Sequence, residues 1–305
     1  MTADIVRAPN HLGDLVLSLP ALRAANADVL VLGSLAPLLA LAGLGGRIVP
    51  LTRGLAGTMA AARALRAARY KRGVLLPPSF SSALIFALGG VAGRRGADTN
   101  SRRLLLTDPV PPSALAGLHR ATQYMVLIGA PAALPTPRLD VPRRVGGEPV
   151  IGVFPGGNAA SRRWDPERFA ELVRRLATGG RRIVVFGGPN ERELTARVAG
   201  TAAVDLGGQT DLAQLATGIA SCDLLVTNDT GPLHLAAAVG TPTVSMWGAG
   251  DPRVTGPLGA GHRMLRHPEL SCVPCTKNEC PLVVQNQCLS LITVDEVEAA
   301  TRGAA

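Results

Sequence analysis

The chain has 305 residues, of which 47% are hydrophobic and only 3% aromatic, and its formal net charge is +9. This length and hydrophobicity exclude a disordered chain and allow two domains, each with its own core. With few aromatic rings, the core must consist of Leu, Val, Ile and Ala, which favours parallel sheets covered by helices. The most apolar stretch, residues 29–44, contains Gly33 and Pro37 and is too short to span a membrane.

The positive charge comes mostly from arginine. Such a surplus fits nucleic acid, an anionic membrane face or phosphorylated substrates, and it also arises from genome composition alone. No basic patch interleaved with aromatic residues is present, so we expect no nucleic acid partner. The first residues lack a basic segment followed by an apolar one, so we expect a cytoplasmic protein.

Strand and helix patterns alternate through the first half of the chain. They predict strands at residues 5–8, 29–32 and 73–76, and helices at residues 14–25, 58–69, 82–88 and 115–128. Residues 131–142 then contain four prolines, which is typical of an extended linker. We therefore place the domain boundary here, with one domain at residues 1–142 and the other at 143–305.

The second half repeats the alternation. Strands are predicted at residues 150–154, 182–186, 203–206, 223–227 and 243–247, with helices at 165–178, 190–198, 212–220 and 231–239. Two such halves predict an α/β protein with two Rossmann-like parallel-sheet domains facing across a cleft. The final helix is a candidate to pack back on the first domain. No G-x-G-x-x-G is present, so the dinucleotide-binding fingerprint is missing.

Residues 228–242 are the most informative segment of the sequence. They contain Asn-Asp-Thr-Gly-Pro-Leu-His between two apolar runs, which predicts a strand, a polar turn, a helix and a strand. Asp229 or Thr230 can cap this helix, and Gly240 suits its end. The free N–H groups and the positive dipole end of such a helix suit a phosphate, although a plain capped helix explains the segment equally well when it is taken alone.

Two further loops follow predicted strands in the second half. Residues 155–164 are rich in glycine and contain Arg162 and Arg163, a composition that suits a diphosphate but also a solvated surface loop. In residues 187–191, Glu191 is able to accept a hydrogen bond from a ribose hydroxyl, or simply to begin a helix. In open α/β sheets ligands bind beyond the carboxyl ends of the strands, where these loops lie.

Asp14 is the candidate catalytic residue of the first half. It follows Gly13 at the start of the first predicted helix, where the helix dipole favours an ionised carboxylate. Such a carboxylate accepts the proton of an attacking hydroxyl, and it also serves as an ordinary helix cap.

Four of the five cysteines crowd the end of the chain, at positions 272, 275, 280 and 288. Four thiolates are able to close a structural zinc site. However, only one pair has the short C-x-x-C spacing, so we expect reduced thiols and no metal site.

Together these motifs resemble glycosyltransferase family 9, the ADP-heptose:lipopolysaccharide heptosyltransferase family. The resemblance spans nearly the whole chain. It rests on the Asn-His-Leu-Gly-Asp run at 10–14, on Pro-Gly-Gly at 155–157 with Arg-Arg-Trp at 162–164, on residues 228–234, on Gly-Ala-Gly-Asp-Pro-Arg at 248–253, and on the late cysteine segment.

The resemblance implies a GT-B enzyme that inverts the anomeric centre without a metal or a cofactor, with the acceptor on the N-terminal domain and the nucleotide-sugar on the C-terminal one. It implies that Asp14 is the general base and that Arg162 stabilises the departing diphosphate, at a position where the family usually has lysine. The implied donor-binding residues are Glu191, Asp229, Thr230, Gly231 and His234.

The expected function is therefore transfer of heptose from ADP-heptose to a lipopolysaccharide-core or related glycolipid acceptor, with peripheral contact at the inner face of the cytoplasmic membrane. Two alternatives stay open. One is a family transferase with a different nucleotide-sugar or a soluble acceptor. The other is a non-catalytic protein that binds a nucleotide-sugar.

Overall fold

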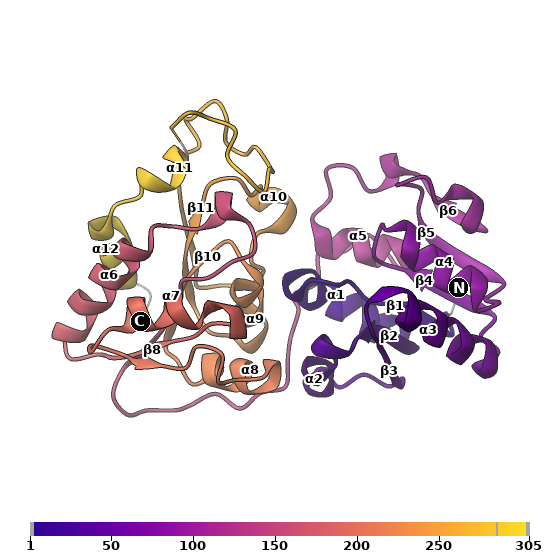
Figure 1. The fold of residues 1–305 in the computed structure, drawn as a ribbon, viewed down its shortest axis with the longest axis horizontal. Helices are drawn as coiled ribbons and strands as arrows, with labels where there is room; N and C mark the ends of the chain where they lie inside the picture. Colours follow the sequence, from indigo (N-terminus) through magenta and orange to yellow (C-terminus); the bar gives the residue numbers. More distant parts are fainter. Residues whose placement is uncertain (1–2, 285, 303–305) are drawn as a thin grey trace. The chain divides into compact units, whose positions relative to one another are not determined.

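The computed structural model describes residues 3–284 and 286–302. The chain divides into two units, Met1–Leu139 and Asp140–Ala305, and the division falls within the proline-rich segment. Each unit contains one six-stranded parallel sheet with helices on both faces, as Figure 1 shows.

The strands of the first unit are β1 (Ile5–Arg7), β2 (Asp28–Leu32), β3 (Ile48–Leu51), β4 (Arg72–Leu75), β5 (Gly93–Ala97) and β6 (Asp108–Val110). Its helices are α1 (Leu12–Ala25), α2 (Ala36–Leu39), α3 (Gly54–Ala68), α4 (Phe80–Leu88) and α5 (Arg120–Leu127). Helix α1 packs against α5, and α3 packs against α4.

The strands of the second unit are β7 (Val150–Phe154), β8 (Arg182–Val185), β9 (Val204–Asp205), β10 (Leu224–Asn228), β11 (Thr243–Trp247) and β12 (His262–Arg266). Its helices are α6 (Pro166–Thr178), α7 (Arg192–Ala199), α8 (Leu212–Ala220), α9 (Gly231–Val239), α10 (Pro252–Thr255), α11 (Gln287–Ser290) and α12 (Val294–Arg302).

Both sheets have the same topology. The order is β3-β2-β1-β4-β5-β6 in the first and, read in the same direction, β9-β8-β7-β10-β11-β12 in the second. In each sheet the strand order reverses beside the first strand, between β1 and β4 and between β7 and β10. Such a reversal leaves a crevice at the carboxyl ends of the two strands, which is where ligands bind in open α/β sheets.

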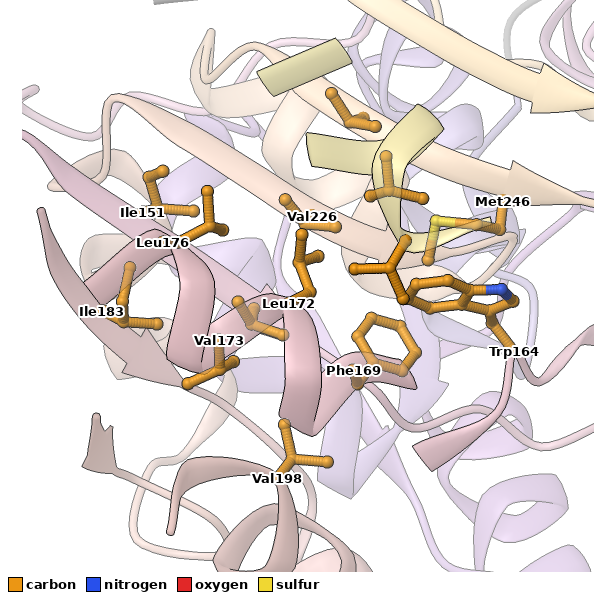
Figure 2. Packing of buried hydrophobic residues seen from close by; sticks show 14 of the residues in the cluster. Ile151, Trp164, Phe169, Leu172, Val173, Leu176, Ile183, Val198, Val226 and Met246 are labelled. Atoms are coloured by element: carbon orange, nitrogen blue, oxygen red, sulfur yellow. The ribbon is translucent and has the colours of Figure 1, made fainter. Parts of the chain in front are cut away.

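The second sheet has a core in which buried strands meet helix α6 (Figure 2). Trp164 lies edge-on to Phe169, with ring centroids 5.0 Å apart, and both rings are almost fully buried. The indole N–H of Trp164 donates to the carbonyl of Ile292 at 2.9 Å, so its polar atom is satisfied inside the core.

The last described helix, α12, packs against α6 and β11 in the second unit. Its Val297 is fully buried in the core of this unit, with Ala300 beside it. The apolar side of α12 is thus used within the second unit. The expectation that the final helix packs back on the first domain stays a prediction. None of the described helices is long and apolar enough to cross a membrane.

The helix predicted at residues 115–128 begins later than expected. Gly117 has φ +71°, a left-handed conformation that interrupts a right-handed helix. Helix α5 starts only at Arg120, where the ring of His119 accepts a hydrogen bond from the N–H of Ala121 at 3.2 Å. This late start matters for the site, because α5 carries the side chains that reach Asp14.

Candidate active site

In the second unit, Asn228 joins the loops at the point where the strand order reverses. It is the last residue of β10 and is fully buried. Its amide N–H groups donate to the carbonyls of Pro155 at 2.8 Å and Gly156 at 3.1 Å, while its Oδ1 accepts from the N–H of Trp164 at 2.9 Å. One side chain thus fixes both ends of the loop after β7.

This loop presents Arg162 to Asp229. The guanidinium Nη1 of Arg162 lies 3.0 Å from Oδ2 of Asp229, whose side chain is only 3% exposed. Burial raises the pKa of the Asp229 carboxyl to about 6, against the smaller opposing effect of the Arg162 charge. The Nε of Arg162 is buried and makes no hydrogen bond within the described residues, so the side chain keeps capacity for an anionic ligand.

Two glycines make room for the carboxylates of Asp229 and Glu191. A Cβ at Gly250 would overlap Oδ2 of Asp229, and a Cβ at Gly156 would overlap the carboxylate of Glu191. Glu191 accepts hydrogen bonds from the N–H groups of Gly157 at 2.9 Å and Gly188 at 2.8 Å. It therefore links the loops after β7 and β8, and its carboxylate bonds to the backbone on both sides.

Helix α9 begins beside this network, after Thr230 at the N-cap position. Neither of the two side chains predicted to cap it does so: Asp229 faces Arg162, and the hydroxyl of Thr230 lies 3.3 Å from that of Thr227. Gly231 is the first helical residue and His234 is buried one turn further on. The helix start thus has no side-chain cap, which suits a bound phosphate.

In the first unit, Asp14 lies in the first turn of α1, beyond the end of β1. The phenol of Tyr124 donates to its Oδ1 at 3.1 Å, and Nε of Arg120 lies 3.7 Å from the same oxygen. Burial, with the Asp14 charge as a smaller cause, raises the pKa of Tyr124 well above its ordinary value, so the phenol stays a donor at neutral pH. The Asp14 side chain keeps 33% of its surface exposed, so a hydroxyl is able to reach it.

Arg7 holds the turn before Asp14. It is 2% exposed and donates to the side chain of Asn10 and to the carbonyl of Leu30. Burial, and to a smaller extent the charge of Arg53, lowers the pKa of Arg7 to about 10. This buried cation still remains charged at neutral pH, and it orders the segment that leads into α1.

The structure thus brings the six predicted residues of the second unit, Arg162, Glu191, Asp229, Thr230, Gly231 and His234, to the loops after three neighbouring strands. Asp14 lies at the corresponding edge of the first sheet. Sequence reasoning missed Asn228 and Arg7 as organising residues and Tyr124 and Arg120 as the partners of Asp14. For Tyr124 the sequence held one hint, because a tyrosine is rare in this chain, which contains only two.

The four late cysteines line one small cavity together with Ser161, Gly248 and Ala249. Their segment lies against the loop of Arg162, since the hydroxyl of Ser161 donates to the carbonyl of Lys277 at 2.5 Å. Even so, residues 3–284 and 286–302 contain no group of three or more His, Cys, Asp or Glu side chains placed so that they could hold a metal ion. Cys222 is buried at the start of β10, and burial raises its pKa to about 12.

Two parallel-sheet units, with loops suited to a phosphate at the strand reversal of the second, define a two-domain α/β protein that binds a phosphorylated ligand. The sequence profile of glycosyltransferase family 9 (heptosyltransferase) matches residues 58–284. The chain therefore belongs to glycosyltransferase family 9, and the predicted family and enzyme class are confirmed.

Known relatives agree with this assignment. Lipopolysaccharide heptosyltransferase 2 of Escherichia coli K12 is 30% identical over 234 residues. The matched segment covers 66% of this chain and 66% of the relative, so the chain spans just under two thirds of the relative's length. The solved structure of E. coli ADP-heptose lps heptosyltransferase II superposes with a TM-score of 0.83 and 25% identity over 100% of this chain and 98% of that one. The predicted GT-B fold is thereby confirmed.

A more distant structure bears on the expectation of no metal. The iron-containing dodecameric glycosyltransferase TibC of enterotoxigenic E. coli matches with a TM-score of 0.67 and 14% identity, over 99% of this chain and 76% of that one. At this identity the likeness shows the fold alone. The absence of a metal requirement therefore stays a proposal.

Proposed function

We propose that the protein transfers heptose from ADP-heptose to a lipopolysaccharide-core or related glycolipid acceptor, with inversion at the anomeric carbon. The observation that carries this proposal is the Arg162–Asp229 pair beside the uncapped start of α9, at the strand reversal of the second sheet. The names of the two similar E. coli proteins, a lipopolysaccharide heptosyltransferase and an ADP-heptose transferase, support the choice of sugar and acceptor.

The donor half of the reaction belongs to the second unit. Arg162 and the N–H groups at the start of α9 offset the charge that grows on the departing diphosphate. Thr230, Gly231 and His234 belong to this helix start, and Asp229 orients Arg162. Glu191 is proposed to contact the ribose, and its present bonds to Gly157 and Gly188 keep its carboxylate beside the diphosphate loop.

The acceptor half belongs to the first unit. Asp14 takes the proton of the acceptor hydroxyl as that oxygen attacks the anomeric carbon, while ADP leaves from the opposite side of the sugar. The bond from Tyr124 fixes one carboxylate oxygen of Asp14 and leaves the other for the substrate. The nucleotide-sugar is a substrate, and we propose that neither a cofactor nor a metal takes part.

We also propose that the enzyme works at the inner face of the cytoplasmic membrane, because a glycolipid acceptor is embedded there. A different nucleotide-sugar or a soluble acceptor remains the alternative within the enzyme class. A purely binding role is less well supported, because the Asp14–Tyr124 arrangement in the first unit has no use in a protein that only holds a nucleotide-sugar.

The donor is tested by a thermal-shift panel of nucleotide-sugars on the purified protein. A ligand that binds only the folded state raises the melting temperature, by an amount that grows with its concentration relative to its Kd. We expect ADP and ADP-heptose to stabilise the protein and UDP- or GDP-sugars to leave it unchanged. If only a UDP- or GDP-sugar stabilises the protein, ADP-heptose is not the donor and that sugar nucleotide is.

Arg162→Ala is expected to lower both donor affinity and turnover, the turnover by roughly tenfold to a hundredfold, because a charge-assisted contact to the diphosphate is lost. Arg162→Lys is expected to keep much of the activity, since it retains the charge. Steady-state kinetics with titrated donor separate the two effects. An alanine variant that behaves like the wild type would show that the diphosphate is held elsewhere, with Arg163 as the next residue to substitute.

ADP affinity is expected to rise as the pH falls from about 7.5 to about 5, because protonation of Asp229, with a pKa of about 6, removes a negative charge beside the diphosphate site. The same raised pKa means that the contribution of this carboxyl to folding stability falls as the pH rises from about 4 to about 6. Calorimetric titration of ADP into the wild type and Asp229→Asn checks the first effect. ADP itself also takes up a proton in this pH range, so the effect of Asp229 is the difference in pH dependence between the wild type and Asp229→Asn. If ADP affinity depends on pH in the same way in both proteins, the expectation is wrong.

A further inference from the structure

The late cysteine segment holds four thiols for which the proposed reaction has no use. Cys272, Cys275, Cys280 and Cys288 line one small cavity in the second unit, which we name the thiol cavity. All four are free cysteines, and each keeps part of its surface exposed. A cysteine that serves only as packing is usually buried, as Cys222 is, so four partly exposed thiols around one cavity indicate a chemical role.

The backbone of this segment is bonded to two loops of the candidate active site. The N–H of Ser161, next to Arg162, donates to the carbonyl of Asn278 at 3.1 Å. The N–H of Thr276 donates to the carbonyl of Ala249, in the loop after β11, at 2.8 Å. The cysteine segment therefore contacts the loop of the diphosphate-binding arginine and the loop after β11 at the same time.

One of the thiols packs directly on the second of these loops. The Sγ of Cys288 lies against Gly248, where an added Cβ would come within 2.5 Å of the sulfur. Two residues further on, Gly250 accommodates Oδ2 of Asp229, which a Cβ at this position would overlap. The backbone between the two glycines thus connects the sulfur of Cys288 to the carboxylate that pairs with the guanidinium of Arg162.

Two of the four thiols are suited to form a disulfide. Burial raises the pKa of Cys288, and among the neighbouring thiols the charge of Cys272 adds most to this effect. Because the effect of a charge grows as the distance falls, Cys272 is the closest of the three. The raised pKa keeps Cys288 protonated and slow to react with an oxidant, which suits the resolving partner of a thiol that is oxidised first.

We propose that the thiol cavity is an oxidation site, in which a disulfide between Cys272 and Cys288 lowers the affinity of the second unit for the nucleotide-sugar. Hydrogen peroxide first converts the thiolate of Cys272 to a sulfenic acid, as the O–O bond breaks and hydroxide leaves. The sulfur of Cys288 then attacks the sulfur of Cys272, so that the S–S bond forms, the S–O bond breaks and the hydroxyl leaves as water with the proton of Cys288. The two thiols together lose two electrons, which reduce the peroxide to water.

The bond acts on the donor site through the backbone of the second unit. It draws Cys288 toward Cys272, so the sulfur no longer packs on Gly248 as it does in the reduced protein. Since Gly250 leaves no spare room beside Oδ2 of Asp229, a shift of this loop displaces the carboxylate that orients the diphosphate-binding arginine. The inference rests on the proposed function, because it takes this ion pair as part of the donor site.

The test compares calorimetric titration of ADP into the full-length protein before and after treatment with hydrogen peroxide, and peptide mapping by mass spectrometry identifies the disulfide. The oxidised wild type is expected to contain the Cys272–Cys288 bond and to bind ADP roughly tenfold more weakly, a usual size for coupling between two sites. Dithiothreitol is expected to restore the affinity.

Three serine variants separate the disulfide from other oxidative damage. Cys272→Ser and Cys288→Ser each remove one partner, so both are expected to keep their ADP affinity after peroxide, and the test does not depend on the folding of either one alone. Cys280→Ser is the matched control, since Cys280 lines the same cavity but has no part in the bond, and it is expected to respond like the wild type.

An oxidised wild type without this bond contradicts the proposal, and so does a Cys272→Ser variant that loses ADP affinity after peroxide. If the reduced wild type binds ADP and the disulfide leaves that affinity unchanged, the redox link alone is wrong and the proposed transfer reaction stands. If the reduced wild type does not bind ADP at all, the proposed donor is wrong and the link to donor binding falls with it. The failure of this inference is therefore distinguishable from the failure of the proposed function.

Discussion

Asp14→Asn is expected to lower turnover by about 10²–10⁴, the usual contribution of a general base. The amide keeps the size of the carboxylate and its ability to accept from Tyr124 at Oδ1, but it cannot take the proton of the acceptor hydroxyl. The fold and donor binding are expected to stay intact, because the donor residues belong to the second unit. Single-turnover kinetics with ADP titration separate binding from chemistry.

Tyr124→Phe is the informative companion to this variant. It removes the hydrogen bond that orients Asp14 while keeping the proton acceptor, so its effect on turnover is expected to be far smaller than that of Asp14→Asn. Near wild-type turnover of Asp14→Asn would remove Asp14 from the mechanism. Weakened ADP binding in the same variant would instead indicate a structural role.

Trp164→Ala is expected to destabilise the second unit by about 3–5 kcal/mol, which corresponds to a fall in melting temperature of roughly 10 °C. The substitution leaves a cavity beside Phe169 (Figure 2). It also removes one of the two donors to the carbonyl of Ile292, the other being Arg168. The backbone N–H of residue 164, which the alanine variant keeps, donates to Asn228, so a displacement of this segment into the cavity is expected to weaken ADP binding together with stability. Differential scanning calorimetry with and without ADP measures both effects.

Trp164→Phe serves as the control, since it keeps an aromatic ring in the core but lacks the indole N–H. We expect it to lose less than half of the stability lost by Trp164→Ala. If the two variants melt at the same temperature, the hydrogen bond to Ile292 rather than ring packing stabilises this region. If neither differs from the wild type, the core described for the second unit is wrong.

Much of the fold could be predicted because its central strands, such as β7, β10 and β11, are rich in apolar and β-branched residues, and because turn residues separate them. Strand β5 could not be predicted, since it reads Gly-Arg-Arg-Gly-Ala. Its arginines are accommodated only by tertiary contacts: Arg94 donates to the carbonyl of Leu105 at 2.6 Å, and Arg95 pairs with Asp108 at 2.7 Å. Strands β3 and β6 contain prolines, which edge strands tolerate and sequence patterns do not reveal.

The positions of the site residues could be predicted because each motif follows a predicted strand, and the ends of parallel strands share one edge. Their pairing could not. The contact of Tyr124 with Asp14 joins residues 110 positions apart, and it depends on the late start of α5. The burial that raises the pKa of Asp229 is likewise a property of the folded chain alone.

The most direct test of the proposed function is product formation from purified protein, ADP-heptose and a deacylated lipopolysaccharide-core acceptor, in buffer with excess chelator. The product is examined by NMR for the anomeric configuration of the new bond, and the metal content of the protein is measured by mass spectrometry. We predict a heptosylated product of inverted configuration, formed at the same rate with and without chelator by protein that contains no stoichiometric metal. A retained configuration, chelator-sensitive turnover in still-folded protein, or binding of ADP-heptose without any transfer would contradict it.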